Sequence, residues 1–247
     1  MKQEKLDFSL VIPCYNEMQV LRQSLRELTK VLDTSTLKYE IIFIDDGSTD
    51  GTRKLGPQLA ERYPNVKWYN NEKNLGRGGA VTRGINLSNA EVVGFIDIDL
   101  ETPAHHILPL VMKVKEGYDI VTGWRIYKLD KTPFHRWVLS KGYNFLIRNF
   151  LGVKLKDTET GCKFFNRERI IPMLALTQDK HWFWDTEIMV IPYLNNYKIY
   201  EMPTLFLRKP DINSTVKIAN DTKKYFLNLI KFKKRIDNEF PKSNRKH

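Results

Sequence analysis

Two aspartates, Asp97 and Asp99, stand one residue apart directly after an apolar run. The run, residues 92–96, contains Val, Phe and Ile, which is typical of a buried strand. In open α/β sheets ligands bind at the carboxyl edge of the strands, where this pair would lie. Two carboxylates are costly to desolvate without a partner, and a divalent cation that also contacts phosphate oxygens would supply one. The pair therefore predicts a metal site for a diphosphate compound.

Two further segments place chemically useful residues after strand-like runs. Residues 45–52 (DDGSTDGT) are rich in turn formers, and Ser48 or Asp50 is expected to cap the helix that follows. Residues 74–80 (NLGRGGA) open another helix and contain Arg77. Their glycines lack the spacing of a dinucleotide fingerprint, and no Walker lysine loop is present. The sequence therefore predicts neither a Rossmann dinucleotide site nor a P-loop.

The elements that must position these residues alternate along the first half of the chain. Strands are predicted at residues 8–12, 39–44, 66–69, 92–96 and 119–122, with helices at 17–32, before 63, from 74 and from 102. Leucines at 21, 25, 28 and 32 recur at helical spacing. This alternation predicts an α/β fold with a mostly parallel, doubly wound sheet and helices on both faces.

The second half carries two stretches in which aromatic and aliphatic residues mix with lysine and arginine. Residues 134–151 and 221–240 are predicted to be amphipathic helices, the second strongly basic. The chain has a formal net charge of +11, and residues 208–247 hold twelve basic and four acidic residues, a net +8. An anionic membrane surface suits this tail, whereas packing of both helices against the body is the structural alternative.

Several features bear on the compartment. Two cysteines, Cys14 and Cys162, lie in different segments without metal-ligand spacing, which favours a reducing compartment without disulfides. The amino terminus runs directly into a predicted strand and shows no signal peptide. No apolar run approaches the ~20 residues that a membrane span requires. We therefore expect a cytoplasmic protein that is peripheral at the cytoplasmic face of a membrane.

Taken together, four motifs in register resemble the inverting family 2 glycosyltransferases, which have the GT-A fold. These motifs are residues 11–17 (VIPCYNE), 44–52, 74–80 and 97–101 (DIDLE). Segments of the second half resemble the dolichol-phosphate mannose and dolichyl-phosphate glucose synthases: residues 122–125, 157–163, 182–187 and 203–217. The resemblance covers about residues 6–235. It implies one domain, residues 1–240, with a tail at 241–247; its parts are a nucleotide-sugar-binding half (6–125), an acceptor-binding half (126–220) and the basic helix (221–240).

For the donor, the resemblance implies a hexose linked to UDP or GDP, with UDP favoured. Mg²⁺ or Mn²⁺ would be held by Asp97, Asp99 and Glu101. The alternative role of Glu101 is to place a negative charge near the start of a helix, where the helix dipole favours it. The residues that would bind the nucleotide sugar are Pro13, Tyr15, Glu17, Asp45, Asp46, Arg77, Asp97 and Ile98. Instead of binding the nucleotide sugar, one of Asp45 and Asp46 could stabilise the turn after its strand. Arg77 could likewise be a solvated surface residue.

For the acceptor, the resemblance implies a polyprenyl or dolichyl phosphate. Its phosphate would be bound by Arg125, Lys156, Thr160, Arg208, Lys209 and Ser214. Lys163 is either a further cation or a surface residue. Asp157, counted with Asp97 and Asp99 as catalytic, would orient a cation or act as a base. Asp185 and Glu187 would bind the sugar, with helix capping as the alternative for Asp185.

Other readings remain open from sequence. The acceptor could instead be a hydroxyl group of a cell-surface polysaccharide or glycan, which would require a base such as Asp157 or Asp185. This chain has residues 213–215 (NST) where related synthases carry Gly-Ser-Lys, so Lys217 is displaced. A basic nucleic-acid-binding protein is a third hypothesis, but the chain contains no nucleic-acid-binding motif and none is expected as a partner. A small transmembrane partner is a further possibility.

Overall fold

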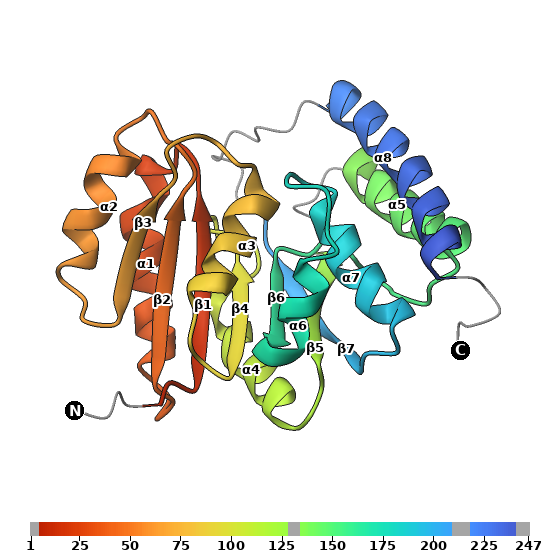
Figure 1. The fold of residues 1–247 in the computed structure, drawn as a ribbon. Coiled ribbons are helices and arrows are strands. Elements are labelled where there is room, and N and C mark those ends of the chain that lie inside the picture. The colour runs from red at the N-terminus through yellow and green to blue at the C-terminus, as the bar shows by residue number, and fades with distance from the viewer. Residues whose placement is uncertain (1–4, 128–133, 209–217, 241–247) are drawn as a thin grey trace.

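A computed structural model describes residues 5–127, 134–208 and 218–240 of the chain. Within these residues seven strands form one sheet in the order β3-β2-β1-β4-β6-β5-β7 (Figure 1). Only β6 runs against its two neighbours, and the other paired strands of the sheet are parallel. The strands are β1 (Phe8–Cys14), β2 (Tyr39–Asp45), β3 (Val66–Asn70), β4 (Val92–Ile96), β5 (Ile120–Tyr127), β6 (Cys162–Asn166) and β7 (Ile199–Phe206).

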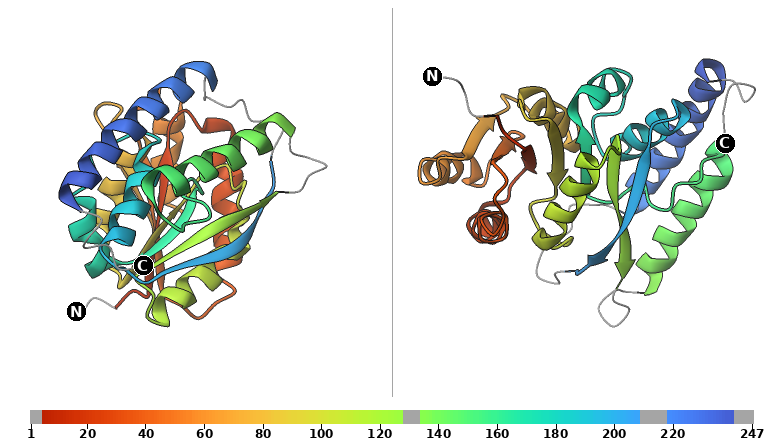
Figure 2. Two further views of the ribbon diagram at one scale, coloured as in Figure 1. Left: turned by 90° about the vertical axis from the view of Figure 1, so that its right-hand side faces the viewer. Right: turned by 90° about the horizontal axis from the view of Figure 1, so that it is seen from below.

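Helices cover both faces of the sheet (Figures 1 and 2). The core on one face includes side chains of α1 and α4, and the core on the other includes side chains of α3, α6 and α7. The described helices are α1 (Met18–Leu32), α2 (Thr52–Ala60), α3 (Arg77–Leu87), the 3₁₀ turn η1 (Ala104–His106), α4 (Ile107–Lys115), α5 (Phe134–Leu151), α6 (Arg167–Leu174), α7 (Trp184–Leu194) and α8 (Ile218–Glu239).

The direction in which successive strands are added to the sheet reverses between β1 and β4. From β1 the chain proceeds outward to β2 and β3, and then returns to place β4 on the other side of β1. Cys14 pairs with Asp45 at the ends of β1 and β2, and β4 runs parallel to β1. The segments after β1, β2 and β4 therefore meet at one edge, at a switch point where α/β proteins bind ligands.

The predicted α/β class and mostly parallel sheet are confirmed. The leucine stripe of α1 is buried as expected, and α5 has the predicted bounds. The sequence did not predict β6, which is antiparallel and inserted between β4 and β5. The helix expected from residue 102 begins as the 3₁₀ turn η1 and becomes α-helical only at Ile107.

The two basic helices α5 and α8 lie side by side on the β5–β7 side of the molecule (Figures 1 and 2). Tyr143 of α5 meets Tyr225 of α8 edge to face, with ring centroids 4.9 Å apart. Ile147 and Leu229 are buried in the core that these helices share with α7. Among the described residues, neither helix is apolar enough along its length to cross a bilayer.

Candidate active site

The loops after β1 and β2 bind each other through side chains. The N–H groups at the start of α1 have no intrahelical acceptors, and Glu17 provides no side-chain cap. Instead, Glu17 N donates to Thr52 Oγ1 (2.8 Å) and Met18 N donates to Asp50 Oδ2 (3.1 Å). Asp50 Oδ1 also accepts the N–H of Thr52 (3.0 Å), the first residue of α2, but the N-cap residue of this helix is Gly51 and not the predicted Ser48 or Asp50. These bonds hold the segment of Pro13, Tyr15 and Glu17, which were predicted to bind the nucleotide, against residues 45–52.

Adjacent aspartates after β2 differ in their surroundings. Asp46 accepts hydrogen bonds from the side chain of Asn71 (2.6 Å) and from Leu75 N and Gly76 N (2.8 and 2.9 Å). Asp46 is therefore the aspartate of the two that holds the loop together, the turn chemistry expected for one of them. Asp45 is fully buried, and its Oδ2 atom has no hydrogen-bond partner among the described residues. An unpaired buried oxygen is costly, so Asp45 is the better candidate to accept a hydrogen bond from a ligand.

Carboxylates gather at the end of β4. Burial raises the pKa of Glu17 to about 7, and the neighbouring Asp99, Asp97 and Asp50 charges add to the effect. For Asp97, burial raises the pKa to about 6; Arg77 opposes this rise and Asp99 reinforces it. The Asp97 side chain is still 36% exposed, so its carboxylate remains open to a ligand. The site accumulates negative charge that a bound cation would relieve.

The backbone within this acidic motif is strained. Leu100, between Asp99 and Glu101, is buried and has φ of 52°, which a residue with a Cβ seldom adopts. Such a conformation costs of order 1 kcal/mol or more and is concentrated at functional sites. The resulting turn lets Asp99 Oδ1 accept the N–H of Glu101 (3.1 Å). Ile98, the residue between the two aspartates, is buried in the core.

Arg77, the first residue of α3, connects the end of β4 to the start of α7. Its Nε atom donates to Asp97 Oδ1 (2.8 Å), and its Nη1 atom bonds Asp185 Oδ2. The guanidinium carbon lies 5.2 Å from the Phe95 ring centroid and 5.3 Å from that of Trp182. The side chain is only 10% exposed. The alternative that Arg77 is a solvated surface residue is therefore wrong.

Asp185 lies between two cations, because Lys163 Nζ binds its second oxygen at 2.6 Å. Lys163 is 0% exposed and also donates to the carbonyl of Thr160, so the surface alternative for this lysine is wrong. Asp185 stands in the first turn of α7 but makes no capping bond. Its partners are the two cations, which rules out capping as its role. A lysine within the apolar strand β6 (CKFFN) was the sequence signal for this buried pair.

Arg125 and Asp157, two residues of the predicted acceptor site, form a largely buried ion pair. Arg125 Nε and Nη2 donate to the two Asp157 oxygens at 2.7 and 2.8 Å, a bidentate pair. Although burial acts to raise it, the pKa of Asp157 is lowered by the Arg125 guanidinium. Lys156 extends its ammonium over the Trp124 ring, 4.3 Å from the centroid. Asp157 is therefore placed to orient a cation and is poorly suited to accept a proton.

The other predicted acceptor residues are only partly placed. Thr160 is fully buried, and its Oγ1 atom has no hydrogen-bond partner within the described residues. Arg208 is half-buried just beyond β7. Lys209 and Ser214 lie outside the described residues. Glu187 accepts two main-chain N–H bonds, from Gln178 and Asp179 (2.6 and 2.8 Å), so its carboxylate is engaged in holding that loop.

Glu159 was given no role by the sequence, yet it joins several parts of this site. Its Oε1 atom accepts the hydroxyl of Thr186 on α7 (2.7 Å), which also bonds the Tyr143 hydroxyl (2.7 Å) and the Tyr225 hydroxyl (3.1 Å). Burial raises the pKa of Glu159 to about 7, with a further contribution from Asp185. This network links α5, α7 and α8 to the loop that holds Asp157.

The predicted metal ligands Asp97, Asp99 and Glu101 do not form a closed cage of three carboxylates in the described structure. The part of the chain that the structure describes contains no group of three His, Cys, Asp or Glu residues arranged to hold an ion. Cys14 and Cys162 are both buried and free. A pair of carboxylates suits an ion that completes its coordination with substrate phosphates and water.

The fold and this edge define the chain as a GT-A type transferase domain. Glucosyl-3-phosphoglycerate synthase from Mycobacterium tuberculosis, solved with Mn²⁺, UDP and glucosyl-3-phosphoglycerate, superimposes with a TM-score of 0.68 over 92% of this chain and 80% of that protein, at 19% identity. This similarity supports the fold, and the predicted GT-A architecture is confirmed.

The profile of glycosyl transferase family 2 matches residues 9–171, and the chain belongs to this family. It is 32% identical over 211 residues to glycosyltransferase AglD of Haloferax volcanii, covering 83% of this chain and 34% of that protein. It is 32% identical over 218 residues to the dolichyl-phosphate beta-glucosyltransferase of Dictyostelium discoideum, covering 81% of this chain. The chain spans 66% of the length of this second relative. The predicted family is confirmed.

Proposed function

We propose that this protein transfers a hexose from a nucleotide sugar to a polyprenyl phosphate at a membrane surface, with inversion at the anomeric carbon. The main observation that supports this proposal is the set of contacts made by the loop of residues 157–161. At one end Asp157 clamps Arg125, and at the other the Gly161 carbonyl accepts the N–H of Asp97 (2.9 Å). One short loop thus joins a carboxylate suited to the donor and an arginine suited to an acceptor phosphate. Relatives named as dolichyl-phosphate glucosyltransferases align with more than four fifths of the chain.

The donor would lie at the switch point between β1 and β4. Pro13, Tyr15 and Glu17 line this edge, and the unpaired Asp45 oxygen would accept a hydrogen bond from the base or ribose. The mycobacterial enzyme of the same fold was solved with UDP, and several relatives are named as glucosyltransferases. UDP-glucose is therefore the first donor to test, with GDP-mannose as the competing donor.

Asp97 and Asp99 suit a Mg²⁺ or Mn²⁺ ion that completes its coordination with phosphate oxygens and water, and we keep Glu101 as a further candidate ligand. The observation that tests this fit is the crowding of carboxylates at this edge: burial first, and then the charges of Asp99, Asp97 and Asp50, raise the pKa of Glu17 to about 7. When bound, such an ion would neutralise negative charge that develops on the departing diphosphate. Arg77 would hold the Asp97 carboxylate in place from the protein side.

The acceptor side favours a phosphate over a hydroxyl group. A phosphate oxygen is already anionic, so the site needs cations to dock and orient it more than it needs a base. Arg125, Lys156 and Thr160 would supply these contacts, and we keep Arg208, Lys209 and Ser214 as further candidates. Asp157 is tied to Arg125 with a lowered pKa, which disfavours the general base that a glycan acceptor would require.

The sugar would lie between these two groups, near Asp185. Because Arg77 and Lys163 already bind both Asp185 oxygens, we propose that Asp185 acts on the sugar mainly by orienting Arg77. Glu187 would support the neighbouring loop. In this arrangement residues 6–125 bind the donor, except that Arg125 at the end of this range binds the acceptor. Residues 126–220 bind the acceptor and also supply Lys163 and Asp185 to the junction.

The helix pair α5 and α8 would bind the lipid surface. Phe145 is 63% exposed and Phe226 is 52% exposed, and lysines at 224, 231 and 234 are also exposed on α8. Exposed apolar side chains and exposed cations on the same pair of helices suit the boundary of an anionic membrane. We propose peripheral attachment at the cytoplasmic face, and a small transmembrane partner remains a further proposal. The basic charge would then serve lipid binding and not nucleic-acid binding.

The direct test is an assay with Mg²⁺ or Mn²⁺, a polyprenyl phosphate and a panel of nucleotide sugars. We expect a lipid-linked hexose that is lost when EDTA removes the metal. Asp99→Asn should lower turnover by about two orders of magnitude or more while the protein stays folded, because it removes a charged oxygen from the metal pair. Asp237→Asn, an exposed change on α8, is the matched control. No product from folded protein with any donor would contradict the proposal.

A further inference from the structure

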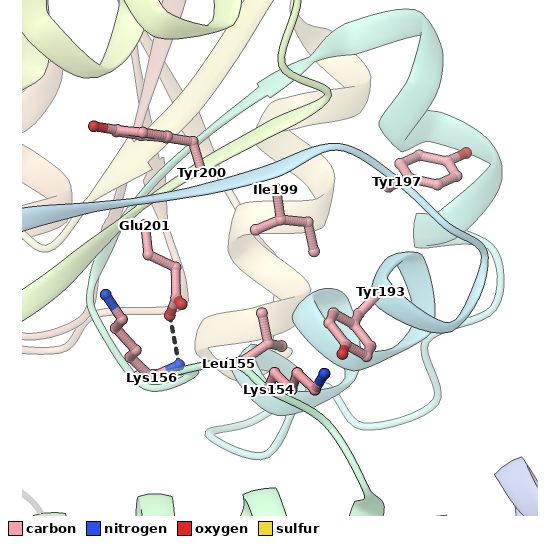
Figure 3. A pocket seen from close by; sticks show the side chains of 8 residues that line it. All are labelled: Lys154, Leu155, Lys156, Tyr193, Tyr197, Ile199, Tyr200 and Glu201. Carbon is pink, nitrogen blue, oxygen red and sulfur yellow. Dashed lines mark hydrogen bonds between the residues drawn. The ribbon is translucent and has the colours of Figure 1, made fainter. Parts of the chain in front are cut away.

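Glu201, on the edge strand β7, holds the acceptor loop from outside the predicted site. Its Oε1 atom accepts hydrogen bonds from two consecutive main-chain N–H groups, those of Lys156 (2.7 Å) and Asp157 (3.1 Å). Figure 3 shows the first of these bonds, with the Glu201 side chain reaching from the strand to the loop. A carboxylate that binds two successive N–H groups fixes both the position and the direction of the main chain there.

The two residues held in this way are those that position the acceptor cations. Lys156 places its ammonium over the Trp124 ring, and Asp157 forms the bidentate pair with Arg125. Trp124 and Arg125 are consecutive on β5, which is paired along its length with β7. The loop is therefore bound to β5 by its side chains and to β7 by Glu201.

Side-chain packing does not fill the space behind this loop. A pocket of about 390 Å³ opens there (Figure 3). It is lined by Lys154, Leu155, Lys156, Tyr193, Tyr197, Ile199, Tyr200 and Glu201. The main chain at Lys156 borders this pocket, so the two hydrogen bonds to Glu201 are its polar attachment on that side.

We propose that Glu201 is a positioning residue for the acceptor. By holding the main chain at residues 156 and 157, it sets where the Lys156 ammonium and the Arg125 guanidinium meet the acceptor phosphate. This inference rests on the proposed function, because it assumes that these two cations bind that phosphate. It assigns no contact between Glu201 and either substrate.

The test compares Glu201→Met with Glu201→Gln. Methionine keeps the length of the side chain but loses the oxygen, whereas glutamine keeps an oxygen that can accept both N–H groups. For Glu201→Met we expect the KM for polyprenyl phosphate to rise about tenfold, as the loss of about one net hydrogen bond predicts, with the KM for the nucleotide sugar unchanged. Glu201→Gln should recover most of the loss. Tyr197→Phe alters the same pocket away from the loop and should match the wild type.

The outcomes separate the two proposals. If the wild type makes lipid-linked sugar and folded Glu201→Met has an unchanged acceptor KM, this inference fails and the function stands. Equal increases in the two KM values would show a general structural defect and would also overturn it. If the wild type is inactive, the proposed function fails; a crystal structure of Glu201→Met then decides whether Glu201 holds the loop. An unmoved Asp157–Arg125 pair in that structure would exclude the positioning role.

Discussion

The Asp97 carboxylate occupies the space that a side chain at Gly161 would fill. A Cβ atom added to Gly161 would lie 1.8 Å from Asp97 Oδ2, far inside any permitted contact. The Gly161 carbonyl also accepts the Asp97 N–H. Residue 161 precedes β6, so the antiparallel strand that the sequence did not predict brings this glycine against the acidic motif of β4.

Gly161→Ala should abolish transfer while the protein still folds, because the new methyl group must displace the Asp97 carboxylate from Arg77. We expect turnover to fall by about two orders of magnitude or more, as when one positioned polar group is lost from an active site. Steady-state assays with a circular dichroism check would measure this.

The matched control for that change is Gly142→Ala. A Cβ atom at Gly142, on α5, would meet no atom within 4 Å. Alanine is favoured over glycine within a helix by about 1 kcal/mol, so this variant should be fully active and slightly more stable. Full activity of Gly161→Ala would show that Asp97 need not occupy its observed position.

Lys163→Met should destabilise the fold, because the ammonium is fully buried and neutralises Asp185. Breaking a buried pair commonly costs about 3–5 kcal/mol; we expect the lower end, since Arg77 would still bind Asp185. Chemical denaturation measures the change. The same substitution at Lys113, which pairs with Glu116 at the surface, should leave the denaturation midpoint unchanged. A stable Lys163→Met protein would show that the buried charge contributes little.

Glu159 should make stability depend on pH. Burial raises its pKa in the folded state to about 7 from an ordinary value of 4.5. Between these values the folded protein binds more protons than the unfolded chain, so the free energy of unfolding must fall as pH rises from about 4.5 to 7. Glu159→Gln removes this titration and should flatten that part of the stability curve. Curves that stay parallel for the variant and the wild type would contradict this pKa.

Membrane attachment should depend on the exposed face of α5 and α8. Replacing Phe145 and Phe226 together by glutamate removes apolar surface and adds negative charge, so flotation with anionic vesicles should fall by about tenfold or more. Met112→Glu changes another exposed apolar residue, on α4, and should float like the wild type. Unchanged flotation of the double variant would exclude this face. Adding RNA to the same assay would reveal any competing nucleic-acid binding.

The sequence determined which chemical groups follow which strands. Asp45, Asp97 and Asp99 each come after an apolar run, and local patterning alone was enough to place them at one edge of a parallel sheet. Helical periodicity likewise predicted α1 and the bounds of α5. These predictions succeeded because burial on a strand or a helix face depends on neighbours within a few residues.

Tertiary structure decided which groups bind one another. Arg77 and Asp185 are 108 residues apart, and Glu201 lies 45 residues from the loop N–H that it holds. Such pairs depend on the order of strands in the sheet and on the reversed direction of β6, which no local pattern specifies. Lys163 shows the difference most clearly: its sequence neighbours permitted a surface position, but the alternation of side chains along β6 directs it to α7, where burial makes Asp185 its necessary partner.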